Sequence, residues 1–120
     1  MPVRALRGAT TLEVDTEEQL ADRVQTLLKE MLARNDVDHD DLISIIFTAT
    51  DDLRAAFPAT VARGLGLGDV PLLCARELAV DGGTPRCVRI LMHFTTERSR
   101  RELHHVYLEG AKGLRDDLPT

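Results

Sequence analysis

The sequence predicts an α+β fold with four strands and two main helices in βαβαββ order. Three stretches carry this prediction. Residues 87–95 alternate apolar and polar side chains, as a strand with one buried face does. Residues 20–31 repeat apolar side chains at helical spacing. Residues 42–50 are apolar on both faces and bounded by polar residues, which is typical of a central strand covered on both sides.

The first element is a short strand over residues 3–10, whose alternation places Arg7 in an otherwise apolar row. Gly8 follows Arg7 and allows a close approach of the backbone. Thr16 then fits the N-cap of an amphipathic helix that ends near residues 34–35. Gln19, three residues after Thr16, can complete a capping box.

The second half starts with a helix at Pro58, which Gly64 and Gly66 are expected to stop. Residues 70–78 form the third strand, and Pro71 marks its start or a sheet edge. The turn residues Asp81-Gly82-Gly83 then predict a hairpin with the strand that begins near residue 86.

The C-terminal part is expected to contain a short helix over residues 97–103 and a short strand or bend over 104–108. From Glu109 the periodicity is lost, so residues 109–120 are predicted to be a mobile tail. Residues 1–120 contain no linker or repeat and are expected to form one domain.

Composition excludes several classes of partner. A formal charge of -5 argues against nucleic acid, because phosphate backbones select dense positive charge. No apolar run is long enough to span a bilayer, and no signal segment is evident, so we expect a cytoplasmic protein without membrane contact. Thirteen of the fifteen basic residues are arginine, which favours fixed, bidentate carboxylate partners.

Metal and covalent chemistry lack the residues they need. The neighbours His104 and His105 point apart on a strand or helix, and the two cysteines have no metal-type spacing. The acidic run 36–41 lacks the glycine and distal glutamate of an EF-hand loop. No phosphate-binding loop or nucleophile motif occurs, and Cys74 has no evident partner base. We therefore expect neither a metal nor a cofactor.

The remaining chemistry lies in four arginines with one acid and one phenol, which suit the binding of a small dicarboxylate: Arg7, Arg63, Arg89, Arg115, Glu77 and Tyr107.

Several blocks of the sequence, in order and nearly from end to end, resemble the monofunctional, trimeric chorismate mutases of the AroH class. They are RGATT from Arg7, FTATDDLRAAFPA from Phe47, VPLLCARE from Val70, GGTPRCVRIL from Gly82, HVYLEGA from His105 and LRDDL from Leu114. The resemblance implies a pseudo-α/β-barrel homotrimer with mixed sheets in the centre, helices outside and active sites between subunits. It also implies the rearrangement of chorismate to prephenate on the route to phenylalanine and tyrosine.

The same resemblance implies roles for individual residues. Arg89 matches the arginine that binds the breaking ether oxygen, and Glu77 the acid that takes the ring hydroxyl. Arg7 and Tyr107 match side chains that bind the substrate's side-chain carboxylate. The neighbouring subunit is expected to supply the wall and rim, and the tail to close over the ligand: Phe57, Arg63, Leu73 and Cys74 for the rim, Leu114 and Arg115 for the tail. Three departures from the family pattern matter, and they concern the rim and lid and leave Arg89, Glu77, Arg7 and Tyr107 unaffected: Thr60, the pair Lys112-Gly113, and Asp116.

An arginine within a strand needs an anionic partner, because burying an unpaired guanidinium is costly. Either Glu77 pairs with Arg89, or both side chains bind a ligand. The surplus of cations favours the ligand, so we predict that a substrate separates Glu77 from Arg89. Two other functions stay open: an imine or enamine deaminase of the RidA type on a similar trimer, and a non-catalytic metabolite-binding trimer.

Overall fold

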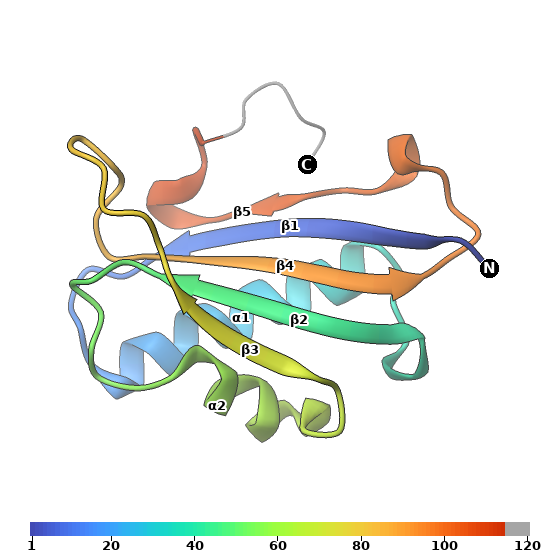
Figure 1. The fold of residues 1–120 in the computed structure, drawn as a ribbon, viewed down its shortest axis with the longest axis horizontal. Coiled ribbons are helices and arrows are strands. Elements are labelled where there is room, and N and C mark those ends of the chain that lie inside the picture. The colour runs from blue at the N-terminus through green and yellow to red at the C-terminus, as the bar shows by residue number, and fades with distance from the viewer. Residues whose placement is uncertain (115–120) are drawn as a thin grey trace.

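The structure is a computed structural model that describes residues 1–114. In these residues a five-stranded mixed sheet, with strand order β3-β2-β4-β1-β5, packs against two helices (Figure 1). The pairs β1–β4 and β2–β4 are antiparallel, whereas β2–β3 and β1–β5 are parallel. The bounds of these elements are β1 Val3–Thr11, α1 Glu17–Arg34, β2 Leu42–Ala49, α2 Pro58–Ala62, β3 Leu72–Arg76, β4 Cys87–Thr95 and β5 Val106–Tyr107.

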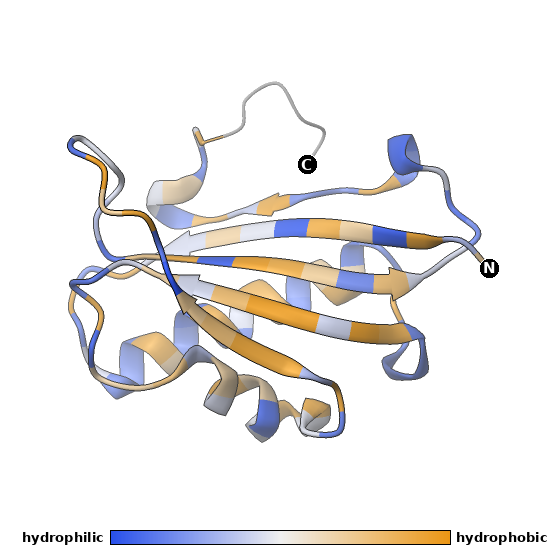
Figure 2. Cartoon of the chain, in the orientation of Figure 1, coloured by the Kyte–Doolittle hydropathy of each residue, from blue (hydrophilic) through white to orange (hydrophobic). Residues whose placement is uncertain are grey.

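The core lies between the helices and one face of the sheet. Both helices cover the same face of the sheet, and hydrophobic residues run along the strands (Figures 1 and 2). The predicted alternation of β4 is confirmed, since every second side chain from Val88 to Phe94 is buried. The apolar stripe of α1 lies opposite, and consists of Leu20, Val24, Leu27, Leu28 and Met31.

The contact between β1 and α1 depends on Gly8. A Cβ at this position would lie 2.4 Å from Sδ of Met31 and 3.2 Å from Cδ1 of Leu27. Because real atoms do not approach so closely, the glycine is what allows the helix to pack directly onto the strand. The close backbone approach expected at Gly8 is therefore confirmed.

Of the two hydrogen bonds of a capping box, the start of α1 has the one to the Thr16 side chain but a different one to the Gln19 side chain. Thr16 is the N-cap, and its Oγ1 accepts a hydrogen bond from Gln19 N at 3.2 Å, as predicted. The Gln19 side chain, however, accepts from the backbone N–H of Val14 at 3.0 Å, beyond the N-cap. This hydrogen bond therefore connects the preceding segment to the first turn of the helix.

Among the described residues no helix combines the length and the apolar character that a membrane span requires.

The segment around α2 follows the predicted signals. Pro58 occupies the first helical turn, and α2 ends at Ala62. The chain then continues through a wider helical turn, Arg63–Leu67, in which Gly66 has φ 87°. This left-handed conformation favours glycine, so Gly66 ends the helical segment as the sequence indicates.

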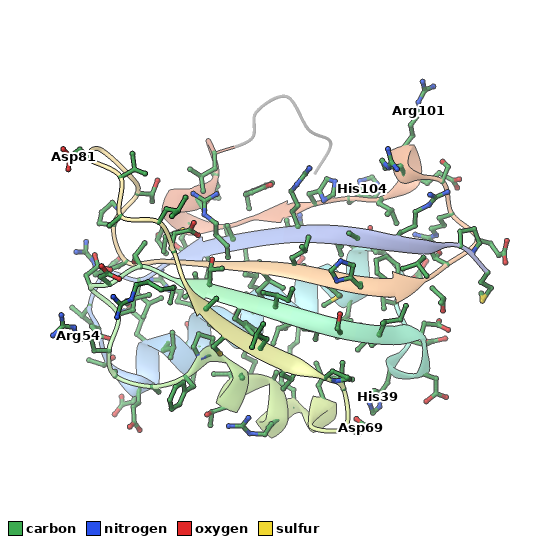
Figure 3. The ribbon with its side chains drawn as sticks, viewed as in Figure 1. His39, Arg54, Asp69, Asp81, Arg101 and His104 are labelled. Atoms are coloured by element: carbon green, nitrogen blue, oxygen red, sulfur yellow. The ribbon has the colours of Figure 1, made fainter. Side chains whose placement is uncertain are left out.

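The predicted hairpin between the third and fourth strands is wrong. β2 lies between β3 and β4, and β3 pairs in parallel with β2 through the α2 crossover. The loop 77–86 therefore spans the end of β2, with Asp81 at its outer tip (Figure 3). Turn residues and alternation predict the two strands correctly, but they do not specify which strand each one pairs with.

Neither α1 nor α2 covers the second face of the sheet. The prediction that β2 is covered on both faces is wrong for the single chain: Ile45 and Phe47 are fully buried beneath the helices, whereas Ile46 is only partly buried. Apolar side chains of other strands are exposed on this open face, including Val3 (56%), Leu73 (59%) and Leu91 (37%). The open face of the sheet therefore combines apolar side chains with the polar groups described next.

Candidate active site

A row of paired residues crosses the open face of the sheet. Thr48 of β2 is opposite Arg89 of β4, Arg89 is opposite Ala9 of β1, and Ala9 is opposite Tyr107 of β5. Paired residues project to the same face, so Thr48, Arg89 and Tyr107 share the open side. The small side chain of Ala9 leaves room between Arg89 and Tyr107. Arg7, two residues before Ala9, lies on the same face.

A cavity of about 300 Å³ lies over this row. It unites the four residues predicted to hold the substrate, which the sequence spreads over a hundred positions. Its size suits a small molecule. The lining consists of Arg7, Gly8, Ala9, Ile46, Thr48, Glu77, Arg89, Ile90, Leu91 and Tyr107.

Glu77 and Arg89 form an ion pair in this cavity. Nε of Arg89 lies 3.1 Å from Oε2 of Glu77, and the hydroxyl of Thr48 donates to the same oxygen at 2.7 Å. The backbone N–H of Glu77 bonds to the carbonyl of Ala49 at 3.0 Å, which fixes Glu77 at the end of β2. The prediction that the two side chains stand apart is therefore wrong for this structure. The contact uses Nε–H, and a guanidinium carries four further N–H donors.

β5 is held next to β1 by side chains as well as by the ladder. The Arg7 backbone N–H donates to Nδ1 of the buried His105 at 3.0 Å. The amide of the buried Asn35, at the end of α1, bonds to both the N–H (2.7 Å) and the carbonyl (2.9 Å) of His104. These contacts fix the short strand that carries the buried Tyr107. Neither histidine belongs to a cluster of three or more potential metal ligands within residues 1–114.

The start of the predicted tail packs against the same row. Residues Glu109–Ala111 form a helical turn, and Gly110 N–H donates to Oγ1 of Thr11 at 2.9 Å. Leu114 contacts the small cluster formed by Ala9, Tyr107 and Ala111. Leu114 is thus brought to the cavity's side of the sheet, while Arg115 lies outside the described residues.

The residues expected at the rim lie elsewhere on this chain, outside the cavity lining. Phe57, 70% exposed, and Cys74 line a separate groove of about 870 Å³ between the start of α2 and β3. Arg63 donates from Nη2 to Oγ1 of Thr60 at 3.0 Å on the helical segment. Leu73 is exposed on β3, the edge strand. The structure therefore places Phe57 and Cys74 in a separate groove, whereas Leu73 is exposed on the open face outside the cavity lining.

Thr48, which orients Glu77, is not among the site residues predicted from the sequence. A signal for it is present in the sequence: in LISIIFTA the polar Ser44 and Thr48 fall on the same face of an otherwise apolar strand.

The nearby Cys87 is almost fully buried, and burial raises the pKa of its thiol, although the positive charge of Arg89 opposes this. Cys87 is therefore a neutral thiol at the start of β4.

Comparison with known proteins identifies the family. The family model of chorismate mutase type I matches residues 3–118. The chain is 44% identical to chorismate mutase AroH of Thermus thermophilus over 119 residues, which are 98% of both chains. It is 40% identical to chorismate mutase AroH of Bacillus subtilis, over 98% of this chain and 94% of that one. The chain belongs to the chorismate mutase type I family.

A solved structure agrees with this membership. The chorismate mutase from Clostridium thermocellum superimposes with a TM-score of 0.89 at 46% identity, over 91% of this chain and 97% of that one. The mixed sheet with helices on its outside is thus the fold of a chorismate mutase, and the predicted α+β class with a mixed sheet is confirmed. The resemblance read from the sequence blocks is confirmed as well.

Proposed function

We propose that this chain is a chorismate mutase, which rearranges chorismate to prephenate without a cofactor or a covalent intermediate. One observation carries the proposal: a member of this family brings Arg7, Glu77, Arg89 and Tyr107 together in one cavity. The enzyme would act in the cytoplasm, in the biosynthesis of phenylalanine and tyrosine, as a single domain over residues 1–120.

The chemistry explains why fixed cations are sufficient. A pericyclic rearrangement transfers no proton to the protein, so catalysis depends on holding the compact conformer and stabilising charge that develops as the carbon–oxygen bond breaks. Arg89 is the proposed donor to the ether oxygen. Its Nε is fixed by Glu77 at 3.1 Å, and the terminal N–H groups are the donors proposed to meet the substrate. A preorganised guanidinium binds the more negative transition state better than the ground state.

The other groups are proposed to hold the substrate. Glu77 would accept a hydrogen bond from the ring hydroxyl, and Thr48 keeps its carboxylate oriented for this role. Arg7 and Tyr107, from two adjacent strands, would bind the side-chain carboxylate. Among the described residues, the cavity lining carries two arginines, Arg7 and Arg89, and one acid, Glu77, and this positive balance supports the binding of a negatively charged substrate.

We further propose that the active enzyme is a homotrimer. The helix-free sheet face, with exposed Val3, Leu73 and Leu91, supports burial against other subunits. Phe57, Arg63, Leu73 and Cys74 of one subunit would then wall the cavity of the next, which would account for their position outside the cavity lining of their own chain. Leu114 and Arg115 would close over the substrate.

The decisive experiment is a chorismate assay with an arginine variant. Arg89→Ala is expected to lose at least about a hundredfold in kcat, because removing one oxyanion donor costs roughly a hundred- to a thousandfold. Arg101→Ala is the matched control, since Arg101 is exposed on the distant turn Arg100–Glu102 (Figure 3). Its kcat should equal that of the wild type. Both proteins should elute as trimers; near-normal turnover by a trimeric Arg89→Ala enzyme would contradict the assignment.

Two further measurements separate this activity from the alternatives. Because no proton moves, the chemical step should show no appreciable solvent deuterium effect. A large effect, or turnover of an imine substrate in place of chorismate, would indicate a deaminase. Tight binding of prephenate without any turnover of chorismate would indicate a non-catalytic metabolite-binding protein.

A further inference from the structure

The residue before β4 has an unusual backbone conformation. Arg86 has φ 45°, in the left-handed region where a Cβ crowds the backbone. Glycine is the residue that adopts this conformation without strain. An arginine there needs surrounding contacts that impose the conformation, and strained residues of this kind gather at functional sites.

The carboxylate of Asp52 binds the backbone N–H of Arg86. The backbone N–H of Arg86 lies 2.9 Å from Oδ2 and 3.2 Å from Oδ1 of Asp52. The Thr50 hydroxyl also donates to Oδ1 of Asp52, at 2.5 Å. Burial opposes ionisation of Asp52, but the hydrogen bonds from Thr50 and from the Arg86 backbone lower its pKa below the ordinary value. Asp52 is therefore a charged acceptor at neutral pH, and such hydrogen bonds are the strong ones.

We call the contacts of Asp52 with Thr50 and Arg86 the Asp52 clamp. Further hydrogen bonds connect this clamp to the start of β4. Thr50 and Cys87 bond twice, from Thr50 N to the Cys87 carbonyl (3.1 Å) and from Cys87 N to Thr50 Oγ1 (3.0 Å). On the other side, Leu12 N donates to the Arg86 carbonyl at 2.8 Å, and Arg86 Nε donates to the Leu12 carbonyl at 3.0 Å. Arg86 is thus tied to the ends of β1 and β2 at once.

This clamp is connected to both members of the ion pair. Arg89 lies two residues beyond Cys87 on β4, and Thr50 directly follows Ala49, whose carbonyl accepts the Glu77 N–H. A second cavity of about 470 Å³ is lined by Asp52 as well as by Glu77 and Arg89. A shift of Arg86 would therefore move the strand end that sets the position of Arg89.

We propose that Asp52 is a positioning residue for the rearrangement: it holds Arg86 in the left-handed conformation and so fixes the register in which β4 presents Arg89 to Glu77. This inference rests on the proposed function. Asp52 acts through the backbone of Arg86, and the substrate meets Arg89. The role has a specific consequence, because glycine at position 86 would adopt the same conformation without the carboxylate.

The test is a set of variants of the full chain, assayed with chorismate. Asp52→Ala should lower kcat and kcat/KM together by roughly ten- to a hundredfold, as expected when a transition-state donor is misplaced. Arg86→Gly alone should keep kcat within about threefold of the wild type, and Asp52→Ala/Arg86→Gly should regain most of the lost kcat. Arg86→Ala is the matched control: it removes the same side chain but keeps the Cβ, so Asp52→Ala/Arg86→Ala should stay slow.

Two outcomes would overturn the proposal: Asp52→Ala with kcat and KM within twofold of the wild type, or a glycine double variant as slow as Asp52→Ala. If Asp52→Ala does not fold, Asp52→Asn, which keeps one acceptor oxygen, replaces it and should lie between the wild type and the loss expected for alanine. Amide hydrogen exchange at Cys87 and Arg89 provides a readout besides turnover. It should accelerate at least about tenfold in the Asp52 variant and recover with glycine at position 86. If the wild type does not turn over chorismate, the proposed function fails, and unchanged exchange would then refute the clamp.

Discussion

The hydroxyl of Thr48 offers a sharp test of how the site is preorganised. Thr48→Val removes the donor to Oε2 of Glu77, at 2.7 Å, and keeps the shape of the side chain. A hydrogen bond to a charged group contributes about 1.5–3 kcal/mol. The Glu77 side chain is 25% exposed, so water replaces part of the loss and the lower end applies. Since about 1.4 kcal/mol is tenfold in rate, kcat/KM for chorismate should fall roughly tenfold.

The assay is steady-state loss of chorismate, with Thr48→Ser as the matched variant. Serine keeps the hydroxyl and should retain kcat/KM within about threefold, because the bond to Glu77 can form. Thr48→Val within twofold of the wild type would refute the idea that Thr48 orients the carboxylate. An equal loss in the serine variant would also refute it, since the methyl group would then be responsible.

Three stability predictions follow from the same structure. Gly8→Ala should lower the free energy of unfolding in urea by about 1–3 kcal/mol, because its Cβ would overlap the fully buried Met31, 2.4 Å from Sδ. Asn35→Ala should lower it by about 2–4 kcal/mol, since it leaves the His104 N–H without its acceptor and removes two further hydrogen bonds. Burial raises the pKa of the Cys87 thiol above its ordinary value, so the unfolded chain loses this proton first as the pH rises. Stability should therefore decline as pH rises through about 9 in a series of thermal melts, and Cys87→Ala should flatten that decline.

Local patterns in the sequence were sufficient for most elements and for one side of the site. The alternation in β4 predicts that Arg89 lies on the face opposite the buried Val88 and Ile90. The alternation in β1 likewise predicts the face on which Arg7 lies. Such patterns record which face of a strand is buried, and this is a local property of the chain. The confirmed cap at Thr16 and the stop at Gly66 are local for the same reason.

Local patterns do not show which strands are neighbours in the sheet. Asp81-Gly82-Gly83 carries the residues of a hairpin turn, yet β3 pairs with β2, because the crossover through α2 brings those two strands together in parallel. The contact of Glu77 with Arg89 is not made across a hairpin, because β3 and β4 are not neighbours in the sheet. It arises because Glu77 stands at the end of β3, one strand away from β4, and reaches across Thr48.

The position of β1 between β4 and β5 has a consequence for how the chain folds. β1 is synthesised first, but its two partners are the last strands of the chain, so each pairing closes a loop of most of the sequence. Contacts of such high sequence separation slow folding, because loop entropy is lost before the ladder forms. β1 therefore stays without its strand partners until β4 and β5 have been synthesised. The cavity that Arg7 and Tyr107 line can form only at that point.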